Sequence, residues 1–231
     1  MTEEALAAVR PKLAIALDVD DLILARRLAA SVSDYFGVAK VGLELFSAAG
    51  PEAIGVMQDL GMDVFLDVKL HDIPNTVGKS ARVLGALGAR YLTMHARGGA
   101  DMLTAGVEGL QAGAEAAGLE SPVGLAVTVL TSDAGAPAHV VPGRLKVAME
   151  SGCGGIVCAG EDLSHARTIA PRLVRVVPGI RPEGVPVDDQ ARSTTPQAAL
   201  DGGADILVVG RAITGADDPE EAAAKLALSL A

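Results

Sequence analysis

The sequence predicts an α/β fold, a single (β/α)8 TIM barrel that fills residues 1–231 as one domain. First, short apolar runs alternate with Ala- and Leu-rich segments that carry charges at helical spacing, which is typical of βα repeats around a parallel sheet. Second, there are eight such runs, at a mean spacing of roughly 29 residues, which suits a closed barrel. Third, no stretch has the composition of an interdomain linker. A doubly wound open sheet is the alternative, although such sheets usually have fewer strands.

Each expected strand is a short apolar run of the kind found in buried parallel strands. The runs occupy residues 12–18, 37–42, 63–69, 90–96, 123–130, 154–160, 174–180 and 205–211. The segments between them, such as 20–32 and 218–231, carry the residue pattern of surface helices. The exception is 180–196, which contains three prolines, a glycine and several charges. We expect a functional loop there, because long loops in compact domains are commonly lids.

Charge and composition exclude several classes of protein. The 19 Lys and Arg residues against 29 Asp and Glu residues give a net charge of −10, which argues against a nucleic-acid surface and a polybasic membrane patch. No apolar run reaches the roughly 18 residues of a membrane helix, and residues 1–12 do not resemble a signal peptide. Cys153 and Cys158 lack C-x-x-C spacing and are expected to pack in the core, so the predicted location is the cytoplasm.

Polar residues end several of the expected strands. They are Asp18, Lys40, Asp67, Lys69, His95 and the pair Gly210-Arg211. A single charge at such a position is commonly a solvated rim residue. In a barrel, however, the carboxyl ends of all strands meet at one face, which is where active sites form. We therefore expect these side chains to gather in one site.

The densest cluster is the stretch 67–76, DVKLHDIPNT. Asp67 and Lys69 are two residues apart and are expected to share one face of an extended strand. The following Ile-Pro pair indicates a stiff turn into a helix, which would present Asp72 and Thr76. A purely structural salt-bridge cluster is the alternative. Against it, buried ion pairs are often replaceable by apolar residues without loss of stability.

Two lysines around one carboxylate permit a specific chemistry. A substrate carboxylate beside Asp67 would be repelled, whereas a carbanion left by loss of CO₂ would be stabilised and protonated by Lys69. The spacing permits decarboxylation but does not single it out.

The stretch 67–76 resembles the D-x-K-x-x-D-I-P-x-T signature of the orotidine 5′-phosphate decarboxylase family, and the likeness runs nearly end to end. Further matching segments, in order, are ALDVD (16–20), AKVGLELF (39–46), VTVLTS (127–132), VPGIRP (177–182), DDQAR (188–192) and VVGRAIT (208–214). The resemblance implies a carboxy-lyase that converts orotidine 5′-monophosphate (OMP) to UMP, the last step of de novo pyrimidine nucleotide synthesis. It also implies that no metal or cofactor is used.

The resemblance also implies a role for each matching residue. Lys40, Asp67, Lys69 and Asp72 would form the catalytic charged network, with Lys69 protonating C6 of the pyrimidine. The substrate-binding residues would be Asp18, Lys40, Asp67, Ile73, Thr76, Thr131, Arg181, Pro182, Gln190, Gly210 and Arg211. Among these, Asp18 and Lys40 would hold the ribose, Thr131 the pyrimidine edge, and Gln190, Gly210 and Arg211 the 5′-phosphate. Asp72, Ile73 and Thr76 would enter the site of the other subunit of a homodimer, and the loop 180–192 would close over the ligand.

Two other functions remain open at this stage. Related sugar-phosphate enzymes, 3-keto-gulonate 6-phosphate decarboxylase and hexulose 6-phosphate synthase, share the D-x-K-x-x-D core but use Mg²⁺ and an acidic ligand near the end of the second strand. Here Lys40 stands in that region and Glu44 lies beyond it, which favours the nucleotide enzyme. A catalytically silent phosphate-binding barrel is the other alternative. His71 and His95 have either an acid–base role or a structural one, and Asp188 and Asp189 place extra negative charge beside Gln190.

Overall fold

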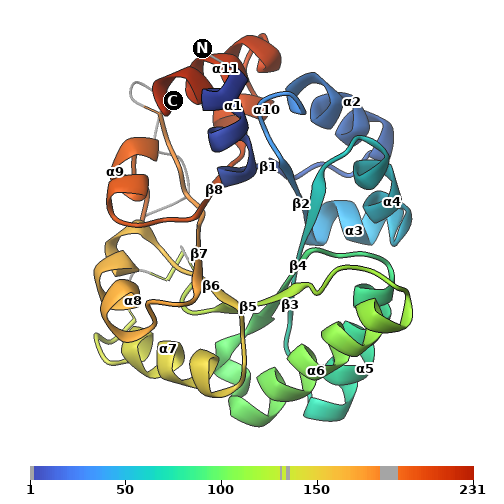
Figure 1. Cartoon of the computed structure of the whole chain (residues 1–231), viewed down its shortest axis with the longest axis vertical. Helices are drawn as coiled ribbons and strands as arrows, with labels where there is room; N and C mark the ends of the chain where they lie inside the picture. Colours follow the sequence, from blue (N-terminus) through green and yellow to red (C-terminus); the bar gives the residue numbers. More distant parts are fainter. Residues whose placement is uncertain (1–2, 131, 134–135, 183–191) are drawn as a thin grey trace.

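The protein is a closed barrel of eight parallel strands surrounded by helices, as seen in a computed structural model (Figure 1). The structure describes residues 3–130, 132–133, 136–182 and 192–231. Each strand pairs in parallel with the next in sequence, and the last strand pairs with the first. The predicted (β/α)8 TIM barrel is therefore confirmed, and the open sheet is excluded.

All eight strands lie within or next to the expected runs. They are β1 (Leu13–Leu17), β2 (Val38–Gly42), β3 (Asp63–Leu70), β4 (Tyr91–His95), β5 (Val123–Val127), β6 (Gly155–Val157), β7 (Val174–Val177) and β8 (Ile206–Val209). The last four end two or three residues earlier than expected. The apolar signal overshoots because residues beyond a strand end can also be buried, as Val129 is after β5. The expected strand 205–211 ended at Arg211, but in the structure Arg211 begins the following helix.

The helices form an outer ring, and the two ends of the chain lie near each other in this ring, next to α1 and α11 (Figure 1). They are α1 (Glu3–Val9), α2 (Leu22–Val32), α3 (Leu43–Ala49), α4 (Glu52–Asp59), α5 (Pro74–Ala86), α6 (Ala100–Ala116), α7 (Val140–Glu150), α8 (Leu163–Ile169), α9 (Pro196–Asp201), α10 (Arg211–Thr214) and α11 (Pro219–Ser229), with 3₁₀ turns η1 (Arg10–Lys12), η2 (Ala96–Gly98) and η3 (Gly160–Asp162). Asp21 and Asp218 cap α2 and α11 by accepting backbone N–H bonds. None of the described helices has both the length and the apolar character needed to cross a bilayer.

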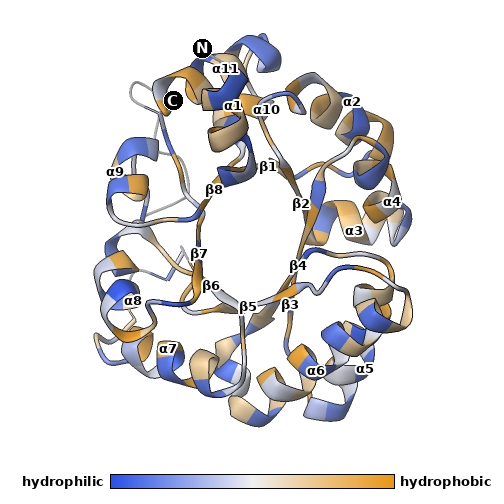
Figure 2. Ribbon diagram, viewed as in Figure 1, coloured by the Kyte–Doolittle hydropathy of each residue, from blue (hydrophilic) through white to orange (hydrophobic). Residues whose placement is uncertain are grey.

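Apolar residues concentrate on the strands and on the helix faces turned toward them, and hydrophilic residues lie mainly outside (Figure 2). The buried apolar residues form two cores. One fills the space between strands and helices, and the other fills the barrel interior with side chains that include Ala16, Val38 and Phe65. Side chains alternate along a strand, so the next inward positions are residues 18, 40 and 67. These positions carry Asp18, Lys40 and Asp67, which replaces the apolar filling by charge at one end of the barrel.

Helices α5 and α6 approach each other closely through glycines. A Cβ atom built on Gly109 of α6 would lie 2.1 Å from the carbonyl oxygen of Gly78 in α5, and one built on Gly113 would lie 2.0 Å from that of Arg82. Backbone atoms cannot rotate aside as a side chain can, so any larger residue must separate the helices. The helix held by this contact, α5, directly follows the loop that carries Asp72.

We expect Gly109→Ala to destabilise the protein. Overpacking costs about 3 kcal/mol here and better helix propensity returns about 1 kcal/mol, which leaves a loss of about 2 kcal/mol. The melting temperature should fall by about 4–8 °C. The matched control is Gly55→Ala in α4, where a Cβ meets nothing within 4 Å, and this variant should melt at or slightly above the wild-type temperature. A Gly109→Ala protein as stable as Gly55→Ala would show that the close approach is not required.

Candidate active site

A cavity of about 540 Å³ opens at the carboxyl ends of the strands, a size typical of small-molecule sites. Seven predicted site residues line it: Asp18, Lys40, Asp67, Lys69, Arg181, Gly210 and Arg211. Apolar residues, including Phe65, Val127 and Val208, line it as well. The cavity therefore combines a charged group from strands β1 to β3 with basic residues that follow β7 and β8.

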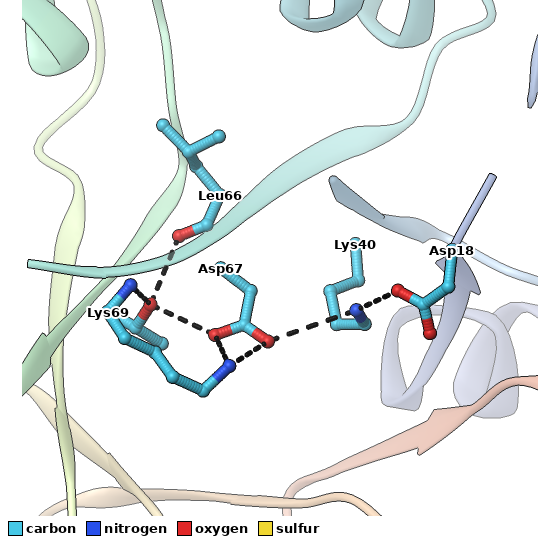
Figure 3. Close-up of polar contacts among 6 residues, drawn as sticks. Asp18, Lys40, Leu66, Asp67 and Lys69 are labelled. Atoms are coloured by element: carbon cyan, nitrogen blue, oxygen red, sulfur yellow. Dashed lines mark hydrogen bonds and ion pairs between the residues drawn. The ribbon is translucent and has the colours of Figure 1, made fainter. Parts of the chain in front are cut away.

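Asp67 lies between two lysines, whose side chains approach its carboxylate from two sides (Figure 3). Lys69 Nζ donates to both carboxylate oxygens at 2.9 Å, and Lys40 Nζ is 3.8 Å from Oδ2. Lys40 Nζ also donates to Asp18 Oδ1 at 2.8 Å. A chain of alternating charge, Asp18–Lys40–Asp67–Lys69, thus crosses the end of the barrel.

Gly42 makes room for the first pair of this chain. A Cβ atom at position 42 would lie 3.0 Å from Asp18 Oδ1 and 3.1 Å from Lys40 Nζ. Any side chain there would press on both charged atoms, so the glycine that ends β2 is part of how the pair is placed.

The charges are shielded to different degrees. The Asp67 and Lys40 side chains are only 14% and 10% exposed, whereas Lys69 is 32% and Asp18 is 58% exposed. Buried ion pairs gain little net stability because desolvation offsets their attraction. An arrangement of this kind at the floor of a cavity is better explained by an interaction with a ligand than by stabilisation of the fold.

Lys69 does not sit in a regular strand, contrary to the alternation we expected for Asp67 and Lys69. Its φ of 48° makes it the one non-glycine residue with positive φ among those the structure describes. The register between β3 and β4 shifts between Leu66 and Leu70. The Asp67 and Lys69 side chains meet, as predicted, although the backbone between them is not that of a regular extended strand. The sequence carries no signal for this irregularity, and Thr93, which lies opposite Lys69, was not predicted as a site residue.

The basic end of the cavity is built after β7 and β8. Gly210 and Arg211 follow β8 directly, and Arg181 follows β7. The segment that carries Arg181 pairs with the start of the segment before α9, because Arg181 N donates to Thr194 O and Thr194 N donates to Gly179 O. Arg192 also donates to Glu161 and Asp162. The described ends of the long loop are thus tied to each other and to η3.

Several predicted site residues do not line this cavity. Asp72, Ile73 and Thr76 are exposed at the start of α5, and the Asp72 carboxylate accepts a bond from the Ile73 N–H at 2.6 Å. Pro182 is partly buried beside Arg181 but does not line the cavity. Thr131 and Gln190, as well as Asp188 and Asp189, lie outside the described residues.

The histidines and cysteines lie apart from the cavity lining. His71 and His95 stack with ring centroids 5.5 Å apart, and His95 Nδ1 accepts a bond from Arg97 N. Burial, followed by the positive Arg144 and by His71, lowers the pKa of His95, so its ring is neutral near pH 7. Cys153 and Cys158 are buried free thiols whose pKa burial raises to about 12, as expected of core packing.

Residues 11–226 match the family model described as "Orotidine 5′-phosphate decarboxylase / HUMPS family". The chain belongs to this family. It is 43% identical over 230 residues to orotidine 5′-phosphate decarboxylase of Anaeromyxobacter sp. (strain K), covering 95% of this chain and 98% of the relative. It is 41% identical over 233 residues to the enzyme of the same name from Moorella thermoacetica, covering 96% and 92% of the two chains.

Solved structures agree with this membership of the orotidine 5′-phosphate decarboxylase / HUMPS family. The crystal structure of orotidine 5′-phosphate decarboxylase from Lactobacillus acidophilus superimposes with a TM-score of 0.80 at 36% identity, covering 96% of this chain and 99% of that one. The one from Pyrococcus horikoshii OT3 gives a TM-score of 0.77 at 28% identity, with 94% and 98% coverage. The family predicted from residues 67–76 is therefore confirmed.

Proposed function

We propose that this chain decarboxylates OMP to UMP, the last step of de novo pyrimidine nucleotide synthesis. The observation that carries the proposal is the Asp67 carboxylate held between the ammonium groups of Lys40 and Lys69 at the floor of the cavity. Family membership and the relatives named orotidine 5′-phosphate decarboxylase support the same reaction.

The proposed chemistry follows from the charges. A substrate carboxylate placed about 4 Å from Asp67 is repelled by about 4 kcal/mol at an effective dielectric near 20. When the C6–CO₂ bond breaks, its electron pair stays on C6 and the repulsion is relieved. Lys69 stabilises the negative carbon and transfers a proton to it, so that a C6–H bond forms as a Lys69 N–H bond breaks. Lys69 then regains a proton from water. The site thus favours the transition state over the bound substrate.

Binding is assigned to the rest of the cavity. In the proposal, Asp18 and Lys40 hold the ribose hydroxyls, while Arg211, the Gly210 N–H and Gln190 hold the 5′-phosphate. Arginine suits this role because its planar guanidinium can donate two bonds to one phosphate. Phosphate sites also commonly form after the seventh and eighth strands of such barrels, where Arg211 lies. The remaining proposed substrate contacts are Asp67, Thr131, Arg181 and Pro182 of the same chain and Ile73 and Thr76 of the other subunit.

The proposal includes a homodimer with shared sites. Asp72, Ile73 and Thr76 are exposed and do not line the cavity of their own chain, and Ile73 is an apolar side chain with 65% exposure. A second copy that covered this segment would bury Ile73 and could receive the Asp72 carboxylate beside its own Lys69. The network would then comprise Lys40, Asp67 and Lys69 of one chain and Asp72 of the other.

The proposed enzyme works without metal or cofactor on a small nucleotide in the cytoplasm, and it binds neither nucleic acid nor membrane. The test is to add OMP to the purified protein in the presence of EDTA and follow the loss of substrate absorbance. Steady turnover to UMP that EDTA does not change supports the proposal. Turnover of sugar phosphates that EDTA abolishes, with no turnover of OMP, would instead favour the magnesium-dependent relatives.

Arg211 should act through the substrate phosphate. We expect Arg211→Ala to lower kcat/KM for OMP by about 10²–10³-fold, since losing a charge-assisted pair of hydrogen bonds costs about 3–4 kcal/mol. The control is the nucleoside orotidine, which has no phosphate, and its slow turnover should be the same in both proteins. An equal loss of activity with orotidine would show that Arg211 does not act through the substrate phosphate.

A further inference from the structure

The irregular part of β3 faces a single residue of β4. Leu66 pairs with Leu92 and Leu70 pairs with Met94, so Asp67, Val68 and Lys69 lie opposite Thr93 alone. Extra residues in one strand bend it and change where its side chains point. Here the bend carries the two charged residues that meet at the cavity floor.

The Thr93 hydroxyl contacts both of these residues. Its Oγ1 accepts a hydrogen bond from the Lys69 backbone N–H at 2.9 Å and donates to Asp67 Oδ1 at 3.0 Å. A second acceptor, the Leu66 carbonyl, is farther away at 3.5 Å. A hydroxyl has one proton to give, and the ionised carboxylate is the nearer and stronger acceptor. One oxygen atom therefore links the Lys69 backbone to the Asp67 carboxylate.

This link holds a conformation that the chain does not favour by itself. Positive φ is unfavourable for a residue with a Cβ atom, and Lys69 has φ 48°. Thr93 is completely buried, so water cannot replace its hydroxyl as a partner. It does not line the cavity and so has no contact with a ligand there.

We infer that Thr93 is a positioning residue for the reaction proposed above, holding Lys69 in its left-handed conformation and Asp67 in the orientation that Lys69 meets. The inference rests on the proposed function for its kinetic consequence. Removing the hydroxyl leaves the Lys69 N–H without its bond and takes one donor from Asp67 Oδ1, so that only the flexible Lys69 side chain still donates to this carboxylate and both residues can shift. Small displacements of reacting groups lower the rate strongly without preventing binding.

The test compares Thr93→Val, which keeps the shape but loses the hydroxyl, with Thr93→Ser, which keeps the hydroxyl. For Thr93→Val we expect kcat to fall about 10- to 100-fold while the Kd for UMP stays within about threefold. Thr93→Ser should recover most of the rate. If Thr93→Val does not fold, Thr93→Ala takes its place, with the same expected gap to Thr93→Ser.

The matched control is Thr128→Val. Thr128 is also fully buried and its hydroxyl also donates one bond, to the Val157 carbonyl at 2.9 Å, but it contacts neither Asp67 nor Lys69. It should lose stability and keep its kcat. Equal kcat losses in the two valine variants, or a serine variant as slow as the valine one, would overturn the inference.

A structural readout separates this inference from the proposed function. If the wild-type protein does not turn over OMP, the proposed function fails, and Thr93 is then judged by the crystal structure of Thr93→Val. The inference predicts that Lys69 leaves the positive-φ region or that its Nζ moves away from Asp67 Oδ1. An unchanged geometry in that structure would overturn it regardless of activity.

Discussion

Lys69→Ala is expected to lower kcat for OMP by at least about 10⁴-fold while UMP still binds. General acid catalysis contributes about 10²–10⁴-fold and electrostatic stabilisation of a developing charge about 10²–10³-fold, and Lys69 is proposed to supply both. Its ammonium group is the nearest cation to Asp67, at 2.9 Å from both oxygens. The proposed phosphate-binding residues Gly210 and Arg211 follow β8, whereas Lys69 belongs to β3, so ligand binding should persist. The measurements are single-turnover kinetics and calorimetric titration with UMP.

Two control variants show whether a loss of activity in Lys69→Ala is specific to this lysine and to the proton that it carries. Lys225→Ala removes a lysine that is 72% exposed on α11 and bonded only to Glu221 among the contacts described for it, so its kcat should equal that of the wild type. Lys69→Arg keeps the positive charge but holds its proton too firmly to give it up, and it should remain severely impaired. The proposed role of Lys69 fails if Lys69→Ala retains a tenth of the wild-type rate. It also fails if UMP binding is lost together with the rate.

The barrel and most of the cavity could be predicted because both depend on simple periodicity. Apolar runs located all eight strands, and the closure of the barrel then required that strand ends carrying Asp18, Lys40 and Asp67 meet. Arg211 was found for the same reason, although it begins α10 instead of ending β8. These residues stand out because a charge after a buried strand is costly without a function.

Thr93 and the conformation of Lys69 could not be predicted in this way. A threonine within a strand looks like any other β-branched residue, since its pattern does not show whether the hydroxyl has a partner. The positive φ of Lys69 depends on how β3 pairs with β4, which is a tertiary property. The same limit applies to Gly42 and Gly109, whose importance lies in the atoms that a side chain there would meet.

Heterodimers made of two differently tagged chains are expected to show that each site uses residues from both subunits. Lys69→Ala and Asp72→Ala homodimers should both be nearly inactive. In the heterodimer of the two variants, the Asp72→Ala chain provides Lys69 and its partner provides an intact Asp72, so one of two sites is complete. The purified heterodimer should therefore show roughly half of the wild-type activity. The measurement is kcat per dimer with OMP after sequential purification on both tags.

The reciprocal heterodimer gives the opposite result and serves as the control. It joins a wild-type chain to a chain that carries both substitutions, so in a shared arrangement the only intact Lys69 lacks Asp72. Its activity should be close to zero, although it contains the same number of altered residues as the active heterodimer. If Asp72 acted within its own chain, the two results would exchange. The exposure of Asp72, Ile73 and Thr76 outside their own cavity favours the shared arrangement. If the two tagged chains do not associate, the proposed homodimer is wrong.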